Sequence, residues 1–281
     1  MTARVPDALD DEIAAVLGSG SLGVEVAASG PGMSELRVYL GPSDDAQAWR
    51  DRAGRVLLAH GLAVAEARLA IDPVADGRWV ERWQASLSPI PLGARFVVLQ
   101  RENAAAPDGR EPIRLVPGMA FGTGEHHTTR LCAAGLEEQV APGSRWLDLG
   151  TGTGLLAIVA ARCGAVRVLA VDLDEEAADV ASSVVAANAA GDVVEVRAGS
   201  IAACSGETFD GIVANIQASF FIANAAGLAR SLVDGGVLVA SGFLEEDIAE
   251  ISSVLAAAGL RVTARRSDGS WACLLARRSE A

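Results

Sequence analysis

The sequence predicts an α/β protein in which a parallel sheet, covered by helices on both faces, follows a smaller α+β domain. From Gly143 onward, apolar strand-like runs alternate with helical stretches, which is typical of a parallel sheet. The last two strand-like runs follow each other directly and meet at Ser267-Asp-Gly269, which is a hairpin signal. A length of 281 residues exceeds one average domain and leaves room for a second, smaller one.

Residues 1–72 are expected to form the smaller α+β domain. Its expected elements are a helix near 8–17, paired strands near 22–26 and 36–40, a helix between Ser43 as N-cap and Gly61, and a strand near 67–71. Strands with two interspersed helices favour a ferredoxin-like sandwich, here with a shortened first strand.

Residues 73–90 are expected to form a connector helix. Trp79 and Trp83 share one helical face there, because they are four residues apart. We interpret the two rings as packing at the joint between the domains; the alternative is that they flank a substrate entrance.

Residues 91–281 are expected to form the larger domain, with 101–111 as a surface loop between strands. Its expected strands are 145–149, 166–171, 193–197, 209–214, 236–241, 260–266 and 270–275, and its expected helices are 153–163, 175–189, 220–232 and 244–258. The prediction is therefore a seven-stranded sheet that ends in an antiparallel hairpin.

The glycine-rich run Trp146-Leu-Asp-Leu-Gly-Thr-Gly-Thr-Gly154 carries the strongest functional information. A strand that feeds a glycine turn and then a helix lets a ligand approach the main chain, because Gly150, Gly152 and Gly154 have no Cβ. This pattern indicates a site for a nucleotide-bearing cofactor.

Two carboxylates indicate which cofactor the turn binds. A dinucleotide fingerprint needs a glycine at the sixth position, where this chain has Leu155. Asp148 precedes the turn, and a carboxylate there would repel a pyrophosphate but suits the ammonium and sulfonium of S-adenosylmethionine. Asp172, 22 residues beyond Gly150, ends the next apolar run and can accept hydrogen bonds from both ribose hydroxyls. The alternative reading is that both acids merely cap strand ends.

Composition narrows the class of protein. The formal net charge of −13 argues against a broad nucleic-acid footprint and favours encounter with a basic partner. The four cysteines are far apart and fit neither a disulfide framework nor a zinc site. With no leader-like start and no apolar stretch long enough to span a bilayer, we expect a cytoplasmic protein without membrane contact, and a monomer.

Three further segments carry a family resemblance: Pro117-Gly-Met-Ala-Phe-Gly-Thr-Gly-Glu-His-His-Thr-Thr-Arg130, Val213-Ala-Asn-Ile-Gln-Ala218 and Arg78-Trp-Val-Glu-Arg-Trp83. Together with the glycine run they resemble the PrmA family, the methyltransferases of ribosomal protein L11, over nearly the whole chain. The terminal hairpin is also the topology associated with class I methyltransferases. The resemblance implies a catalytic domain that binds S-adenosylmethionine, an amino-terminal domain that grips the ribosomal protein, and methylation of lysine amines and the terminal amine.

The resemblance also implies roles for single residues. Thr129 matches the threonine that closes the cofactor site, Gly150 the first glycine of the turn, Asp172 the ribose-binding acid, Ser200 a position that contacts adenine, and Asn215 the asparagine that faces the transferred methyl group. The chain departs from the family at His127 and at 217–221, which lie beside the expected substrate channel.

Methyl transfer to an amine requires a neutral amine held in line with the methyl group, so the site mainly has to orient the reactants. We expect the Asn215 side-chain oxygen to accept hydrogen bonds from that amine. His126 and His127 are adjacent and form a poor metal site, so no metal is expected. We interpret His126 as hydrogen-bonded to the glycine loop and His127 as largely solvated, with a role of His126 in the cofactor lid as the alternative.

Two other functions remain open from the sequence. One keeps the cofactor but changes the acceptor to another protein, a small amine or a nucleic acid. The other is a non-catalytic scaffold that binds the cofactor.

Overall fold

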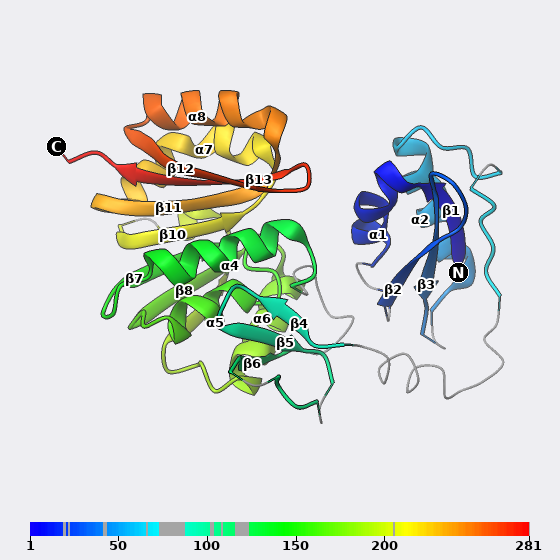
Figure 1. The fold of residues 1–281 in the computed structure, drawn as a ribbon, viewed down its shortest axis with the longest axis horizontal. Helices are drawn as coiled ribbons and strands as arrows, with labels where there is room; N and C mark the ends of the chain where they lie inside the picture. Colours follow the sequence, from blue (N-terminus) through cyan, green and yellow to red (C-terminus); the bar gives the residue numbers. More distant parts are fainter. Residues whose placement is uncertain are drawn as a thin grey trace. The chain divides into compact units, whose positions relative to one another are not determined.

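The computed structural model describes residues 1–18, 21, 23–41, 44–65, 67–72, 88–101, 104–107, 109–115, 124–204 and 206–280. The chain divides into two compact units, Met1–Leu87 with Val116–Phe121 and Ser88–Leu115 with Gly122–Ala281 (Figure 1). The predicted connector helix, with Trp79 and Trp83, lies outside the described residues except for its last three positions. Of these, Ile90 begins a strand rather than ending a helix.

The first unit has the βαββα order of a ferredoxin-like fold. Its elements are β1 (Thr2–Pro6), η1 (Asp7–Leu9), α1 (Asp10–Gly18), β2 (Gly23–Ala28), β3 (Met33–Tyr39) and α2 (Ala46–Ala59). The strands form an antiparallel sheet in the order β1-β3-β2, and an isolated antiparallel bridge joins Ala70 to Thr2 where a further strand was predicted.

The first strand is the shortest of this sheet, with five residues against six in β2 and seven in β3, which fits the expected shortened strand. All five residues of β1 pair with β3, from Thr2 opposite Arg37 to Pro6 opposite Met33. Only Ala3 and Val5 of this strand are buried, and two apolar positions are too few to show the alternation that identifies a strand. Helix α2 is capped by Asp45, whose carboxylate accepts hydrogen bonds from two backbone amides of the first turn. The predicted cap, Ser43, lies outside the described residues.

The second unit contains the predicted seven-stranded sheet. Its strands are β7 (Arg145–Leu149), β8 (Arg167–Asp172), β9 (Val194–Ala198), β10 (Phe209–Asn215), β11 (Leu232–Leu244), β12 (Leu260–Asp268) and β13 (Trp271–Arg278). They are arranged in the order β12-β13-β11-β10-β7-β8-β9. Strands β7 to β11 are parallel to one another, and β13 is antiparallel to both β11 and β12, so the predicted terminal hairpin is confirmed.

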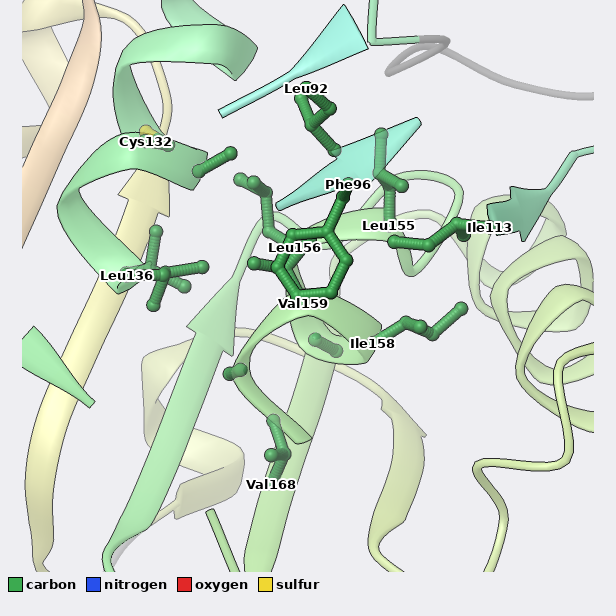
Figure 2. Packing of buried hydrophobic residues seen from close by; sticks show 14 of the residues in the cluster. Leu92, Phe96, Ile113, Cys132, Leu136, Leu155, Leu156, Ile158, Val159 and Val168 are labelled. Carbon is green, nitrogen blue, oxygen red and sulfur yellow. The ribbon is translucent and has the colours of Figure 1, made fainter. Parts of the chain in front are cut away.

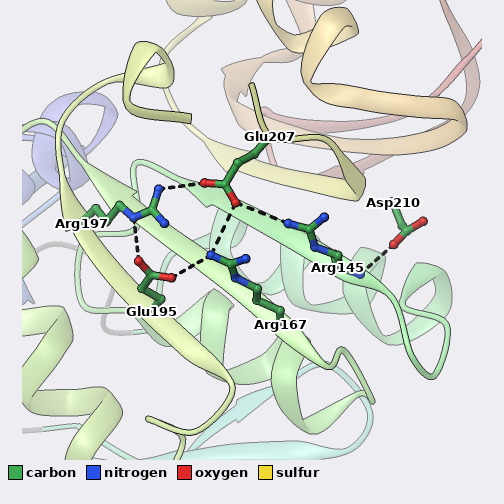
Figure 3. A network of polar contacts seen from close by, with 6 residues as sticks. All are labelled: Arg145, Arg167, Glu195, Arg197, Glu207 and Asp210. Atoms are coloured by element: carbon green, nitrogen blue, oxygen red, sulfur yellow. Dashed lines mark hydrogen bonds and ion pairs between the residues drawn. The ribbon is translucent and has the colours of Figure 1, made fainter. Parts of the chain in front are cut away.

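Helices cover both faces of this sheet. One face is packed by α4 (His127–Gln139), α5 (Leu155–Arg162) and α6 (Glu175–Ala187), and the other by α7 (Ala218–Ser231) and α8 (Ile248–Ala257), which follows η3 (Glu245–Asp247). The connection from β9 to β10 contains the short helix η2 (Ile201–Cys204). Near it, arginines of β7, β8 and β9 form an ion-pair network with Glu195 and Glu207 (Figure 3).

A second, three-stranded sheet was not predicted in detail: β4 (Ile90–Leu92), β5 (Phe96–Leu99) and β6 (Glu111–Arg114). Its Phe96 points into the cluster formed by Leu155, Leu156 and Val159 of α5 (Figure 2). The sheet therefore packs over the helix that follows the glycine turn. None of the helices in the described part of the chain is long and apolar enough to cross a membrane.

Candidate active site

The glycine turn lies at the carboxyl end of β7, between that strand and α5. Gly150, Gly152 and Gly154 have φ angles of 71°, 54° and 78°, in the left-handed region that favours glycine. A Cβ at Gly150 would lie 2.8 Å from Cγ1 of Ile216, and a Cβ at Gly154 would lie 3.3 Å from that of Ala181. These glycines were predicted to let a ligand approach the main chain, whereas at Gly150 and Gly154 the protein's own side chains occupy the space that a Cβ would need.

Asp148 lies on β7 on the face covered by α4 and α5, and it is fully buried. Its Oδ2 accepts a hydrogen bond of 2.6 Å from the Thr151 hydroxyl, while its Oδ1 has no hydrogen-bond partner among the described residues. Burial raises the pKa of this carboxyl group to about 7, against the opposing effects of hydrogen bonds from the Thr151 side chain and the Ala157 backbone. A buried acid with a free acceptor atom is an unusual feature and points to a ligand group.

Asp172 is the last residue of β8, and its carboxylate is oriented by two backbone amides. Oδ2 accepts from the N–H of Gly152 at 2.8 Å, and Oδ1 accepts from the N–H of Asp174 at 3.1 Å. A carboxylate has about four acceptor positions, so each oxygen keeps capacity for one further donor. The geometry fits a pair of hydroxyl groups.

Asn215 ends β10 on the face of the sheet that α4 covers. Its Nδ2 donates a hydrogen bond of 3.3 Å to Oγ1 of Thr129, which is 1 % exposed in the first turn of α4. This contact joins two predicted site residues that are far apart in the sequence. It also turns the amide so that Oδ1 is the atom left to accept a hydrogen bond from a ligand.

His126 and His127 lie at the start of α4. His126 is the N-cap of this helix: its Nδ1 accepts a hydrogen bond from the backbone N–H of Thr128, and its ring packs edge-on against Trp271. His127 is not simply solvated, because its Nδ1 lies 2.9 Å from Oδ1 of Asp268. The hydrogen bond from Arg130, together with that from His127, lowers the pKa of Asp268. These contacts fasten the β12–β13 hairpin to α4.

Ser200 is exposed, and its Oγ accepts a hydrogen bond from the backbone N–H of Ala202 at the start of η2.

Sequence reasoning missed Leu173, which follows Asp172 and is 79 % exposed. This exposed apolar side chain lies at the end of β8, directly after Asp172. Its position directly after a buried strand and an acid was the signal that could have found it. No group of three or more metal-binding side chains occurs in the part of the chain that was described.

The strand order, the glycine turn after β7 and the acid that ends β8 define a class I methyltransferase, a Rossmann-like enzyme fold. The model of the family named ribosomal protein L11 methyltransferase (PrmA) matches residues 32–279, and the chain belongs to this family.

Relatives with that same name support the assignment. One from Pelotomaculum thermopropionicum is 38 % identical over 255 residues, which cover 90 % of this chain and 82 % of the relative. One from Chloroflexus aurantiacus is 36 % identical, covering 87 % and 82 %. The crystal structure of a ribosomal protein L11 methylase from Lactobacillus delbrueckii subsp. bulgaricus is similar with a TM-score of 0.63 and 29 % identity, over 69 % of this chain and all of the other. The family, fold and enzyme class predicted from the motifs are confirmed.

Proposed function

We propose that this methyltransferase transfers methyl groups from S-adenosylmethionine to lysine amines, and to the terminal amine, of ribosomal protein L11. The observation that carries the proposal is the Asn215–Thr129 hydrogen bond, because it presents an amide oxygen at the carboxyl edge of the sheet, next to the glycine turn. The names of the family and of its relatives supply the protein substrate.

The described residues fit the cofactor. The unpartnered Oδ1 of buried Asp148 suits an ammonium group, and the two oriented oxygens of Asp172 suit the ribose hydroxyls. Leu173 would cover one face of the adenine. The exposed Ser200 lies on the neighbouring segment, because the N–H of Gly199 donates a hydrogen bond of 2.7 Å to the carbonyl oxygen of Asp172. S-adenosylmethionine supplies, when bound, a methyl group on a positively charged sulfur.

Asn215 would then orient the acceptor amine. A lysine amine has an ordinary pKa of about 10.4 and must lose its proton before its nitrogen can accept a methyl group. A site that excludes water already disfavours the charged amine, so no strong base is needed. Oδ1 of Asn215 would accept a hydrogen bond from the neutral amine and direct its lone pair, while Thr129 holds the amide in place.

The net charge and the cysteines support proposals about the oligomeric state, the class of substrate and the cellular compartment. We infer that it acts as a monomer on a basic protein rather than on nucleic acid, because its net charge is −13. The four thiols are free, which suits the reducing cytoplasm.

The test is incubation of the enzyme with methyl-labelled S-adenosylmethionine and L11 that lacks the modification. We expect label on lysine residues of L11, and at least a hundredfold slower single-turnover transfer in Asn215→Ala, with little change in cofactor affinity. Label on another acceptor would replace L11 as the substrate. Cofactor binding without any transfer would leave only the scaffold function.

A further inference from the structure

Ile216 directly follows Asn215, and it contacts the glycine turn and the neighbouring strand together. Its side-chain atoms Cγ1 and Cδ1 lie 2.8 and 2.9 Å from the point where a Cβ of Gly150 would stand. Its backbone N–H donates a hydrogen bond of 2.9 Å to the carbonyl oxygen of Ser241 on β11. Ile216 thus contacts both the glycine turn after β7 and strand β11, which lie on opposite sides of β10 in the sheet.

Gly242 makes room for the main chain of Ile216. Its φ angle is 95°, and the pairing of β11 with β13 shifts between Ser241 and Phe243, which marks a bulge at this glycine. A Cβ at position 242 would lie 2.6 Å from both the backbone nitrogen and the carbonyl oxygen of Ile216. Only glycine allows the chain after Asn215 to lie this close to β11.

We propose that Ile216, seated against Gly242, is a positioning residue that fixes the Asn215 amide relative to the glycine turn. The proposal rests on the proposed function, in which Asn215 directs the acceptor amine. The backbone of Asn215 pairs with Ser241 of β11, its side chain donates to Thr129, and the side chain of the next residue, Ile216, packs against the glycine turn. A displacement of about 1 Å can slow an enzyme about a hundredfold, so this spacing matters for the methyl-transfer step rather than for affinity.

The decisive experiment combines an added methyl group at Gly150 with a truncated side chain at Ile216. We expect Ile216→Ala to slow single-turnover methylation of L11 about tenfold or more, with little change in the Kd of S-adenosylmethionine measured by calorimetry. Gly150→Ala introduces a methyl group into the space of the Ile216 side chain and slows the reaction as well. The double variant removes this clash, and we expect it to react about tenfold faster than Gly150→Ala alone.

Gly154→Ala is the matched control. It introduces the same methyl group into the same turn at a similar φ of 78°, but its neighbour is Ala181 instead of Ile216. Ile216→Ala should therefore give no recovery in the Gly154→Ala background. Gly242→Ala should stay slow when it is combined with Ile216→Ala, because its Cβ meets main-chain atoms of Ile216 that the truncation does not remove.

Urea unfolding of the cofactor-free proteins gives a second readout that needs no substrate. Gly150→Ala should lower the denaturation midpoint, and adding Ile216→Ala should partly restore it. Adding Ile216→Ala to Gly154→Ala should give no such recovery. A double variant no faster than Gly150→Ala overturns the proposal, as does an Ile216→Ala enzyme that loses cofactor affinity but not rate. A wild-type enzyme that leaves L11 unlabelled overturns the proposed function instead.

Discussion

Asp148 makes the stability of the protein depend on pH. Burial raises the pKa of its carboxyl group from 3.8 to about 7, so between these values the folded protein holds a proton that the unfolded chain has released. The free energy of unfolding contributed by this group must fall as pH rises through that window. Asp148→Asn removes the titration and keeps an acceptor oxygen for Thr151. We expect the variant to gain stability over the wild type with rising pH, by up to about 1.4 kcal/mol per pH unit.

Urea unfolding of both proteins from about pH 4 to pH 8 checks this, because the other titrating groups are common to both and cancel in the difference. The same variant should bind S-adenosylmethionine more weakly, since it lacks the carboxylate that we propose binds the ammonium group. Parallel stability profiles for the two proteins would show that Asp148 does not titrate in this range.

We expect the hydroxyl group of Thr129 to increase the rate of methyl transfer. Thr129→Val keeps the shape but removes the acceptor for the Asn215 amide, at 3.3 Å in the structure. A lost hydrogen bond of about 1 kcal/mol corresponds to roughly a fivefold slower single-turnover methylation. Thr129→Ser keeps the hydroxyl and should retain most of the rate. Equal rates in the two variants would show that the hydrogen bond does not orient Asn215.

The site residues predicted from residue chemistry alone are those whose signal is local, whereas Thr129, Ser200 and Asn215 were predicted from the family resemblance. Asp148 and Asp172 flank an unusual glycine spacing, and each ends or follows an apolar run, so strand ends alone place them together. Ile216 and Gly242 were not found, because their role depends on a contact between strands whose register the sequence does not display. The partner of His127, Asp268, was hidden for the same reason: the two residues meet only after the terminal hairpin folds onto α4.

At the scale of elements, the helix α4 crosses the sheet at Gly135. A Cβ there would lie 2.8 Å from Cγ1 of Val239 on β11, so Gly135→Ala should push the helix away and destabilise the fold by about 1–3 kcal/mol. Gly227 of α7 is the matched control, since its Cβ would meet only Ile201, at 3.5 Å. Gly227→Ala should stabilise by about 0.5–1 kcal/mol through helix propensity.

Thermal or urea unfolding of the two variants measures this difference. Destabilisation of similar size at both positions would mean that helix packing on β11 is not what requires Gly135. The truncation Val239→Ala should reduce the cost of Gly135→Ala, because it removes the atom that the new methyl group meets.

Element length decided which secondary structure could be predicted. The strands from β7 to β13 have five to thirteen residues and alternate with helices up to β12, and their order was predicted correctly. Strands β4, β5 and β6 have three or four residues each, too few for alternation to appear. They are stabilised by contacts over α5, such as those of Phe96, which are distant in sequence (Figure 2).

At the scale of the whole molecule, each unit has its own core. In the first unit, Val5, Ile13, Leu36 and Leu57 are fully buried together around α1 and α2. We therefore predict that residues 1–72, expressed alone, fold cooperatively and bind L11 without methylating it. A urea titration followed by circular dichroism, and calorimetry with L11, check the two parts. A broad, non-cooperative transition would show that the boundary predicted at residue 72 is wrong.

The net charge of −13 should steer a basic substrate toward the enzyme. Steering acts over distances comparable to the Debye length, which shrinks from about 30 Å at 0.01 M salt to about 3 Å at 1 M. We expect kcat/KM for L11 to fall about tenfold or more with rising ionic strength, because fewer encounters are productive. The kcat at saturating L11 is the internal control and should stay nearly constant, since bound substrate needs no steering. A kcat/KM that is flat or rises with salt would show that recognition depends on short-range apolar contacts, and that the acidic charge serves only solubility.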